Sequence, residues 1–82
     1  MASPIRVLVV DDSALMRRLV SDMLASDPGI EVVGTARDGD DALAKIPVLS
    51  PHVVTLDVEM PGRDGLSTLA EIMQRHPLPV VM

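Results

Sequence analysis

Three aspartates stand where short apolar runs end, and carboxylates in such places can bind a cation or act as nucleophiles. Asp11 and Asp12 follow the run IRVLVV, and Asp57 follows the run VVTL. Acids within a few ångströms of one another repel, so a cluster persists either by holding protons or by sharing a cation. The chain has no cysteine, and no histidine is spaced to join these acids as a ligand. Hard oxygen ligands alone favour Mg²⁺, which tolerates carboxylates and keeps several waters.

The residues around Asp57 extend this hypothesis to phosphate chemistry. A bound Mg²⁺ binds phosphates and can align a carboxylate to attack phosphorus. Asp57 ends the most uniformly apolar run and is the best-placed nucleophile, and an aspartyl phosphate is a known kind of covalent intermediate. We therefore predict that Asp11, Asp12 and Asp57 bind Mg²⁺, that the backbone carbonyl of Glu59 completes the site, and that Asp57 is the catalytic nucleophile.

A structural interpretation of the same acids stays open. Asp11 and Asp12 also suit a strand-to-helix turn that caps the next helix, because acids are favourable at helix starts. Asp57 also suits an ordinary turn. Three acids at the start of the second helix are expected to cap it and remain solvated, namely Asp38, Asp40 and Asp41, and Asp64 is expected to cap the third helix.

Alternating strand and helix patterns must position the three aspartates. Apolar, β-branched runs predict strands over residues 5–10, 30–36, 53–56 and 80–82. Helical spacing of apolar residues predicts a helix over 13–25, a second over 38–46 ended by Pro47 and the Ser50-Pro51 turn, and a third between Asp64 and His76. On the third helix, one apolar face is predicted to comprise Leu66, Leu69, Ala70 and Met73.

This alternation predicts an α/β fold with a parallel sheet and right-handed crossovers. The expected architecture is a flavodoxin-like doubly wound sheet with strand order 2-1-3-4, truncated after the start of the fourth strand. In that order the first and third strands are neighbours. Their carboxyl ends open into one crevice, so Asp11, Asp12 and Asp57 are expected to converge there.

Composition limits the alternatives. The chain has 82 residues, 48% of them hydrophobic, and a net charge of −5, which is typical of a small folded segment of at most one domain. Negative charge without a basic cluster argues against a nucleic-acid partner. No apolar run is long enough to span a membrane or to form a signal peptide, so we expect no membrane partner and a cytoplasmic location.

Three segments together resemble a known family. VLVVDDSALMRRLVSDML, ARDGDDAL and HVVTLDVEMPGRDGLSTL are similar to the receiver domain of bacterial two-component response regulators, and the likeness runs from Arg6 to the last residue. LDVEMPGRDGLSTLAEIM and HPLPVVM look most like the regulatory domain of the chemotaxis protein-glutamate methylesterase. The resemblance implies a phosphoprotein of chemotaxis signalling.

The resemblance also implies roles for single residues. Asp57 would be the phosphoacceptor, receiving its phosphoryl group from a phosphohistidine of a sensor histidine kinase. Asp11, Asp12 and the carbonyl of Glu59 would hold Mg²⁺ with it, while the turn beyond the site would be shaped by Pro61 and Gly65.

The resemblance further implies that residues 1–82 are the N-terminal portion of a receiver domain. A hydroxyl and a lysine that contact the phosphoryl group in this family would lie beyond Met82, as would the output domain that the receiver regulates. In the full-length protein that output domain would be a partner of the receiver, and a protein-glutamate methylesterase and glutamine deamidase. The 82 residues alone are expected to have no such enzymatic activity.

The expected short sheet leaves part of its surface uncovered. Right-handed crossovers put the first helix on one face and the second and third on the other. One face is then covered by a single helix, which leaves apolar surface over the third and fourth strands, and the fourth strand is an unpaired edge. We therefore expect the chain to self-associate, to exchange elements between copies or to be a remnant of a longer protein.

Two other functions remain possible from the residues. One is a Mg²⁺-dependent phosphotransferase or phosphatase of a topoisomerase-primase-like fold, in which Asp57 and Glu59 would bind metal through both side chains. An enzyme of that fold would require a glutamate after the first strand, where this chain has two aspartates. The other is an interaction module that works without phosphorylation. The turn after the first strand has no glycine-rich phosphate loop, which argues against a nucleotide-binding Rossmann domain.

Overall fold

Strands and helices alternate along the chain in the computed structural model, which describes residues 3–58 and 64–82. The elements are β1 (Ile5–Val10), α1 (Ala14–Ala25), β2 (Ile30–Ala36), α2 (Gly39–Leu49), β3 (Val53–Leu56), α3 (Gly65–Arg75) and β4 (Val80–Val81). The first three strands have the predicted bounds, and the fourth is one residue shorter than expected.

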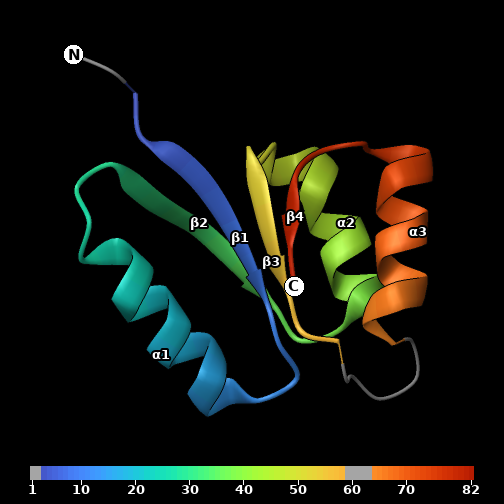
Figure 1. The fold of residues 1–82 in the computed structure, drawn as a ribbon, viewed down its shortest axis with the longest axis horizontal. Helices are drawn as coiled ribbons and strands as arrows, with labels where there is room; N and C mark the ends of the chain where they lie inside the picture. The colour runs from blue at the N-terminus through green and yellow to red at the C-terminus, as the bar shows by residue number, and fades with distance from the viewer. Residues whose placement is uncertain (1–2, 59–63) are drawn as a thin grey trace.

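The strands form one parallel sheet in the order β2-β1-β3-β4, which confirms the predicted α/β fold and strand order. β1 lies inside the sheet between β2 and β3, and β4 lies at the outer edge (Figure 1). Val10 at the end of β1 is paired with Ala36 of β2 and with Leu56 of β3. The three strands therefore end at one level, and the loops that follow them start side by side.

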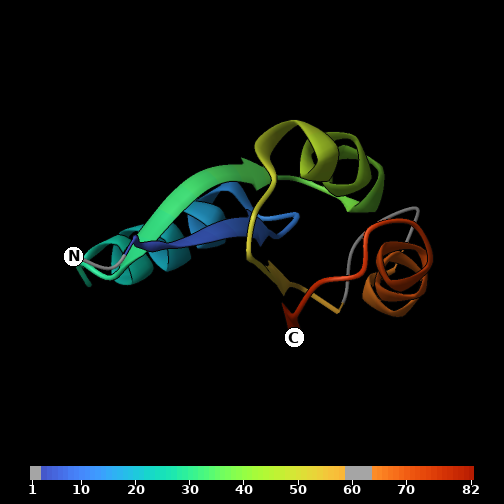
Figure 2. The same cartoon turned by 90° about the horizontal axis from the view of Figure 1, so that it is seen from above.

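The core lies between the sheet and the pair of helices α2 and α3 (Figure 2). Alternate residues of β1 and β3 point to this side, since side chains in a strand alternate between the two faces. They pack against Leu43 and Ile46 of α2 and against Ile72 of α3. The strand residues that contribute are Leu8, Val10, Val54 and Leu56, all at most 3% exposed.

Each helix begins at a polar cap. The Ser13 hydroxyl accepts from the Met16 N–H at 3.2 Å, and the Asp38 carboxylate accepts from the Asp41 N–H at 2.8 Å. The Asp64 carboxylate likewise accepts from the Ser67 N–H at 2.8 Å. These bonds satisfy amides that have no partner within the helix. The capping roles predicted for Asp38 and Asp64 are thus confirmed.

The predicted end of α2 was wrong, because the helix continues through Pro47 to Leu49. Pro47 has no N–H, so the last turn of the helix has one hydrogen-bond donor fewer. Two hydrogen bonds satisfy carbonyl groups near the end of the helix. Arg6 Nη2 donates to the carbonyl of Leu49 at 2.6 Å, and the Ser50 N–H donates to that of Ile46 at 2.8 Å. Ser50 takes a left-handed conformation with φ 49° and ends the helix.

The predicted apolar face of α3 was right only for Leu69, which is half-buried and packs against the core, and wrong for Leu66, Ala70 and Met73, which are exposed. Leu66 and Met73 are 63% and 44% exposed, whereas Gly65, Thr68 and Ile72 are buried. The orientation of the helix follows from Gly65, whose missing side chain lets the start of α3 lie directly against the end of β3. The face that starts at Gly65 is therefore turned inwards, and Leu66 is turned outwards.

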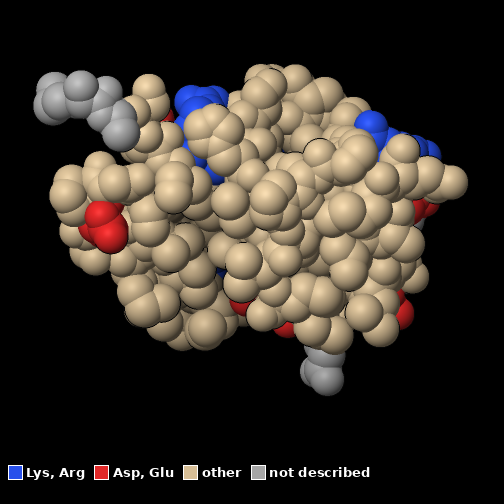
Figure 3. Space-filling model, turned by 45° about the horizontal axis from the view of Figure 1, so that its top comes forward, with Lys and Arg blue, Asp and Glu red and all other residues tan. Residues whose placement is uncertain are grey.

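The opposite face of the sheet is covered by α1 alone. No residue of α1 is fully buried, and its Leu15, Leu19 and Met23 are 66%, 51% and 66% exposed. Val81 of the edge strand is 59% exposed. In the view of Figure 3, uncharged residues cover the middle of the surface and the charged side chains lie mainly at its margins. Among the described residues, no helix is both long enough and apolar enough to cross a membrane.

Thr68 has a buried hydroxyl that finds no hydrogen-bond partner in the described part of the chain. A buried hydroxyl without a partner costs about 1–3 kcal/mol. We predict that Thr68→Val, which keeps the shape and removes the hydroxyl, raises the free energy of unfolding by about 1 kcal/mol. Thr68→Ser keeps the hydroxyl and loses a methyl group, so it should lower that free energy by about 1 kcal/mol. Denaturant unfolding measures both variants, and a valine variant less stable than the unmutated chain would contradict this account.

Candidate metal centre

Three carboxylates meet at the carboxyl edge of the sheet. Asp11 and Asp12 follow β1, and Asp57 follows β3. The neighbouring strand holds the backbone at Asp57, whose N–H donates to the Val10 carbonyl of β1 at 3.0 Å. One oxygen from each of the three carboxylates lies within 4.8 Å of the others. Asp11 and Asp57 are half-buried and Asp12 is exposed, so the cluster opens to solvent on one side.

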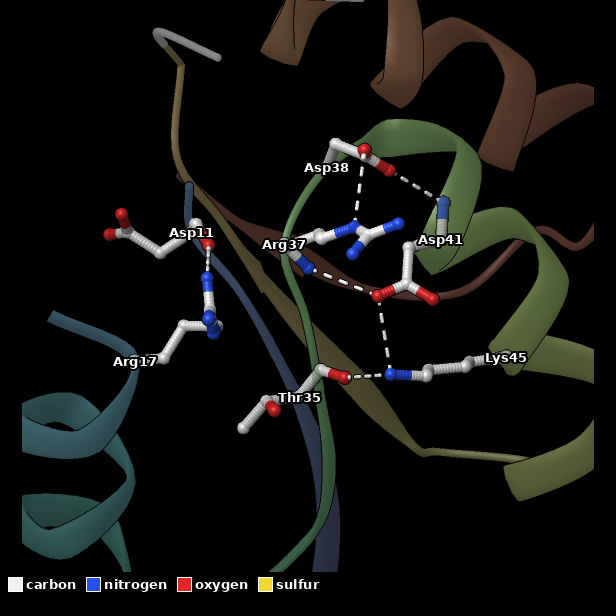
Figure 4. A network of polar contacts seen from close by, with 7 residues as sticks. All are labelled: Asp11, Arg17, Thr35, Arg37, Asp38, Asp41 and Lys45. Carbon is white, nitrogen blue, oxygen red and sulfur yellow. Dashed lines mark hydrogen bonds and ion pairs between the residues drawn. The ribbon is translucent and has the colours of Figure 1, made fainter. Parts of the chain in front are cut away.

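Asp11 is fixed through its backbone and its side chain. Its N–H donates to the Ala36 carbonyl of β2 at 3.0 Å, and its Oδ1 accepts from the Ser13 N–H at 3.0 Å. Its carbonyl accepts from Arg17 Nη1 of α1 at 2.8 Å (Figure 4). Asp11 therefore performs part of the turn role that the structural interpretation gave it. One of its carboxylate oxygens also belongs to the three-acid cluster.

Gly65 positions the start of α3 against the loop that carries Asp57. Its N–H donates to the Val58 carbonyl at 2.8 Å. A Cβ at this position would lie 2.5 Å from the Asp57 carbonyl oxygen and 2.6 Å from the Val58 Cα, a distance that only a shift of the backbone would relieve. Hence Gly65 allows the close approach of helix and loop. The role expected for Pro61 in this turn falls outside the described residues.

Crowding raises the pKa of one acid of the cluster. The pKa of Asp12 is raised above its ordinary value, first by desolvation, then by a hydrogen bond with the Asp57 carboxyl and by repulsion from Asp57 and Asp11. By contrast, the pKa of Asp64 is lowered by hydrogen bonds from the Ser67 and Leu66 amides at the start of α3. Of these two acids, Asp12 is therefore the one that a bound proton or a nearby cation would stabilise.

The donor set of the cluster suits Mg²⁺. All three ligands are hard carboxylate oxygens on adjacent loops, one side is open for waters or a phosphate, and the repulsion between the acids would be relieved by a divalent charge. Glu59, whose carbonyl was predicted as a further ligand, lies outside the described residues. A cavity of about 180 Å³ adjoins the acids on the α1 side and is lined by Asp11, Asp57 and apolar residues that include Val9, Val20 and Val81.

A second polar network lies at the start of α2 (Figure 4). Lys45 Nζ donates to the Thr35 carbonyl at 2.6 Å and to Asp41 Oδ2 at 3.2 Å, and the Arg37 N–H donates to the same Asp41 oxygen at 3.1 Å. Burial opposes ionisation of Asp41, but the Arg37 and Lys45 donors outweigh it and lower the pKa of this carboxyl. Asp41 is thus a structural anion that joins β2 to α2 and lies apart from the three-acid cluster.

The raised pKa of Asp12 predicts a pH-dependent cost to stability. Ionisation of Asp12 is disfavoured in the folded chain, so its cost is absent well below the ordinary carboxyl pKa and appears as the pH rises through the raised value. Without divalent ions, Asp12→Asn should raise the midpoint of thermal unfolding at neutral pH, and the gain should vanish on acidification. Asp22→Asn, which changes an exposed acid of α1, is the matched control and should show no such gain. An equal or lower midpoint for Asp12→Asn at neutral pH would contradict the prediction.

Comparison with known proteins agrees with this geometry. The family model of the response regulator receiver domain matches residues 7–82. A protein-glutamate methylesterase/protein-glutamine glutaminase of Symbiobacterium thermophilum is 66% identical over 79 residues, which are 96% of this chain and 22% of that protein. The Bacillus subtilis protein of the same description is 58% identical over 78 residues, which are 95% of this chain and 22% of that protein. The chain thus spans about a fifth of the length of these relatives.

Solved structures of receiver domains also match this chain. The response regulator domain of Thermotoga maritima CheB matches with a TM-score of 0.90 and 48% identity, over 94% of this chain and 57% of that one. The CheX-CheY-BeF3-Mg²⁺ complex of Borrelia burgdorferi matches with a TM-score of 0.86 and 33% identity, over 95% of this chain and 60% of that one. With its strand order, its three converging aspartates and a family match over residues 7–82, the chain belongs to the receiver domains of two-component response regulators.

Proposed function

We propose that this chain is a phosphoacceptor switch in which Asp57 receives a phosphoryl group from a phosphohistidine of a sensor histidine kinase. The convergence of Asp57 with Asp11 and Asp12, in a chain of the receiver family, carries the proposal. Membership of that family also argues against a topoisomerase-primase-like enzyme. The related structure from Borrelia burgdorferi is a complex with BeF3 and Mg²⁺, which supports Mg²⁺ as the ion for this site.

Each residue of the cluster has a role in this reaction. A carboxylate oxygen of Asp57 forms a bond to phosphorus while the phosphorus–nitrogen bond to the donor imidazole breaks, and the leaving nitrogen takes up a proton. Asp11, Asp12, Asp57 and the carbonyl of Glu59 would hold Mg²⁺, which when bound neutralises charge on the phosphoryl oxygens. The bond from the Asp57 N–H to the Val10 carbonyl keeps the nucleophile at the end of β3.

We also propose that residues 1–82 are the N-terminal portion of a receiver domain within a longer protein. The chain covers 57% of the Thermotoga maritima CheB receiver structure and about a fifth of the methylesterase relatives, which supports this division. The output domain would then be a protein-glutamate methylesterase, regulated by the state of Asp57. A hydroxyl and a lysine contributed by later strands would contact the phosphoryl group.

The phosphoacceptor role predicts a covalent adduct on Asp57. After incubation with a small-molecule phosphodonor, intact-mass measurement should detect one phosphoryl group on the unmutated chain in Mg²⁺ and none without it. The adduct should be labile to hydroxylamine, as an acyl phosphate is. Asp57→Asn should abolish it, whereas Asp22→Asn, a matched change of an exposed acid on α1, should leave it intact.

The outcome without an adduct is also informative. The test would then be repeated on a chain extended through a fifth strand, which supplies the hydroxyl and the lysine. An adduct on the extended chain would show that those groups are required. An extended chain that also stays unmodified would contradict the phosphoacceptor role and favour an interaction module that works without phosphorylation.

We further propose that the 82-residue chain self-associates through the face covered by α1 alone. Leu19 and Val81 are 51% and 59% exposed on that side, and β4 is an unpaired edge of the sheet. Sedimentation analysis should show a mass that grows with concentration, and Leu19→Lys or Val81→Lys should shift it towards the monomer. Val48→Lys, at a site 80% exposed on α2, is the control and should not. A monomer at every concentration would contradict this proposal.

A further inference from the structure

Arg17 contacts the acidic cluster without ligating it. Its half-buried side chain reaches back from α1, and Nη1 donates to the carbonyl oxygen of Asp11 at 2.8 Å (Figure 4). The next residue, Arg18, shows the contrast: its side chain is 83% exposed and its Nε lies 3.8 Å from Asp22 on the same helix. Two adjacent arginines of α1 thus have different environments, and only Arg17 turns towards the site.

The bonded carbonyl belongs to the peptide group that joins Asp11 to Asp12. On the Asp11 side, β2 holds the N–H through Ala36 and the Ser13 amide holds one carboxylate oxygen. The bond to Ala36 leaves the following peptide free to turn about the Asp11 ψ angle, whereas the Ser13 bond spans that peptide and restrains it. The bond from Arg17 is a second restraint, applied at the carbonyl oxygen of this peptide, and so helps to set the direction in which the Asp12 side chain leaves the backbone.

We propose that Arg17 is a positioning residue for the divalent-ion site, which it serves by fixing the Asp11–Asp12 peptide so that both carboxylates face Asp57. This inference rests on the proposed function, because it concerns the ion which that function requires. Hydrogen-bond partners that orient metal ligands typically contribute 10–100-fold to metal affinity.

The sign of the effect separates positioning from charge. A positive side chain near a cation site weakens cation binding by repulsion, so removal of its charge alone should strengthen Mg²⁺ binding. Loss of positioning should weaken it. The two explanations therefore predict opposite changes in the dissociation constant when Arg17 is made neutral.

The test compares Arg17→Met with Arg18→Met, which removes the same charge one residue away. We expect the Mg²⁺ dissociation constant, measured by NMR titration, to rise about 10-fold in Arg17→Met and to stay unchanged in Arg18→Met. In metal-free samples the ¹⁵N shift of Asp12 should move in Arg17→Met alone, because that nitrogen belongs to the peptide whose carbonyl loses its donor. Arg17→Lys keeps a charged donor and should restore part of the affinity.

The outcomes distinguish this inference from the proposed function. Saturable Mg²⁺ binding that is equally tight or tighter in Arg17→Met would overturn the positioning role and leave the site itself standing. An equal loss in both methionine variants would also overturn it, since it would indicate a general effect of α1. Absence of saturable binding in the unmutated chain would overturn the metal site, and the role of Arg17 with it.

Discussion

The parallel pairing of β1 with β3 is the contact on which both the core and the acidic cluster depend. On one face of these two strands it brings together Leu8, Val10, Val54 and Leu56, which form the centre of the core. At their carboxyl ends it brings Asp57 beside Asp11 and Asp12. The same register thus stabilises the fold and creates electrostatic repulsion, because apolar side chains fill the strands and acids follow immediately after them.

Neutral backbone groups hold the acids in place against this repulsion. Asp11 is bonded to the Ser13 amide and, through its own N–H, to Ala36, while the Asp57 amide is bonded to Val10. Such bonds fix geometry without cancelling the charge, so the raised pKa of Asp12 persists. At the start of α2, by contrast, the charge of Asp41 is balanced within the chain by an ion pair with Lys45. The cluster therefore retains a charge that an external cation can balance, and the Asp41 network does not.

Periodicity and polarity were enough to predict the strands, their order and the convergence of the three aspartates, because the topology of parallel sheets follows from few rules. Contacts between elements were not predictable in the same way. The continuation of α2 past Pro47 depends on Arg6, a residue of β1 that donates to the last carbonyl of the helix. The inward face of α3 depends on the close approach of Gly65 to Asp57, and no apolar spacing reports that approach. Arg17 lies one turn after the cap Ser13, but only the structure shows its bond to Asp11.

The position of β1 between β2 and β3 also bears on the order in which the chain can acquire its site. The unit β1-α1-β2 is continuous in sequence, so pairing of β1 with β2 closes a short loop. β3 is farther along the chain, so its pairing with β1 closes a longer one. A folding species that contains only the first unit would present Asp11 and Asp12 without Asp57. An ion that requires all three carboxylates would then bind only after β3 has docked, and would stabilise the completed sheet over every earlier form.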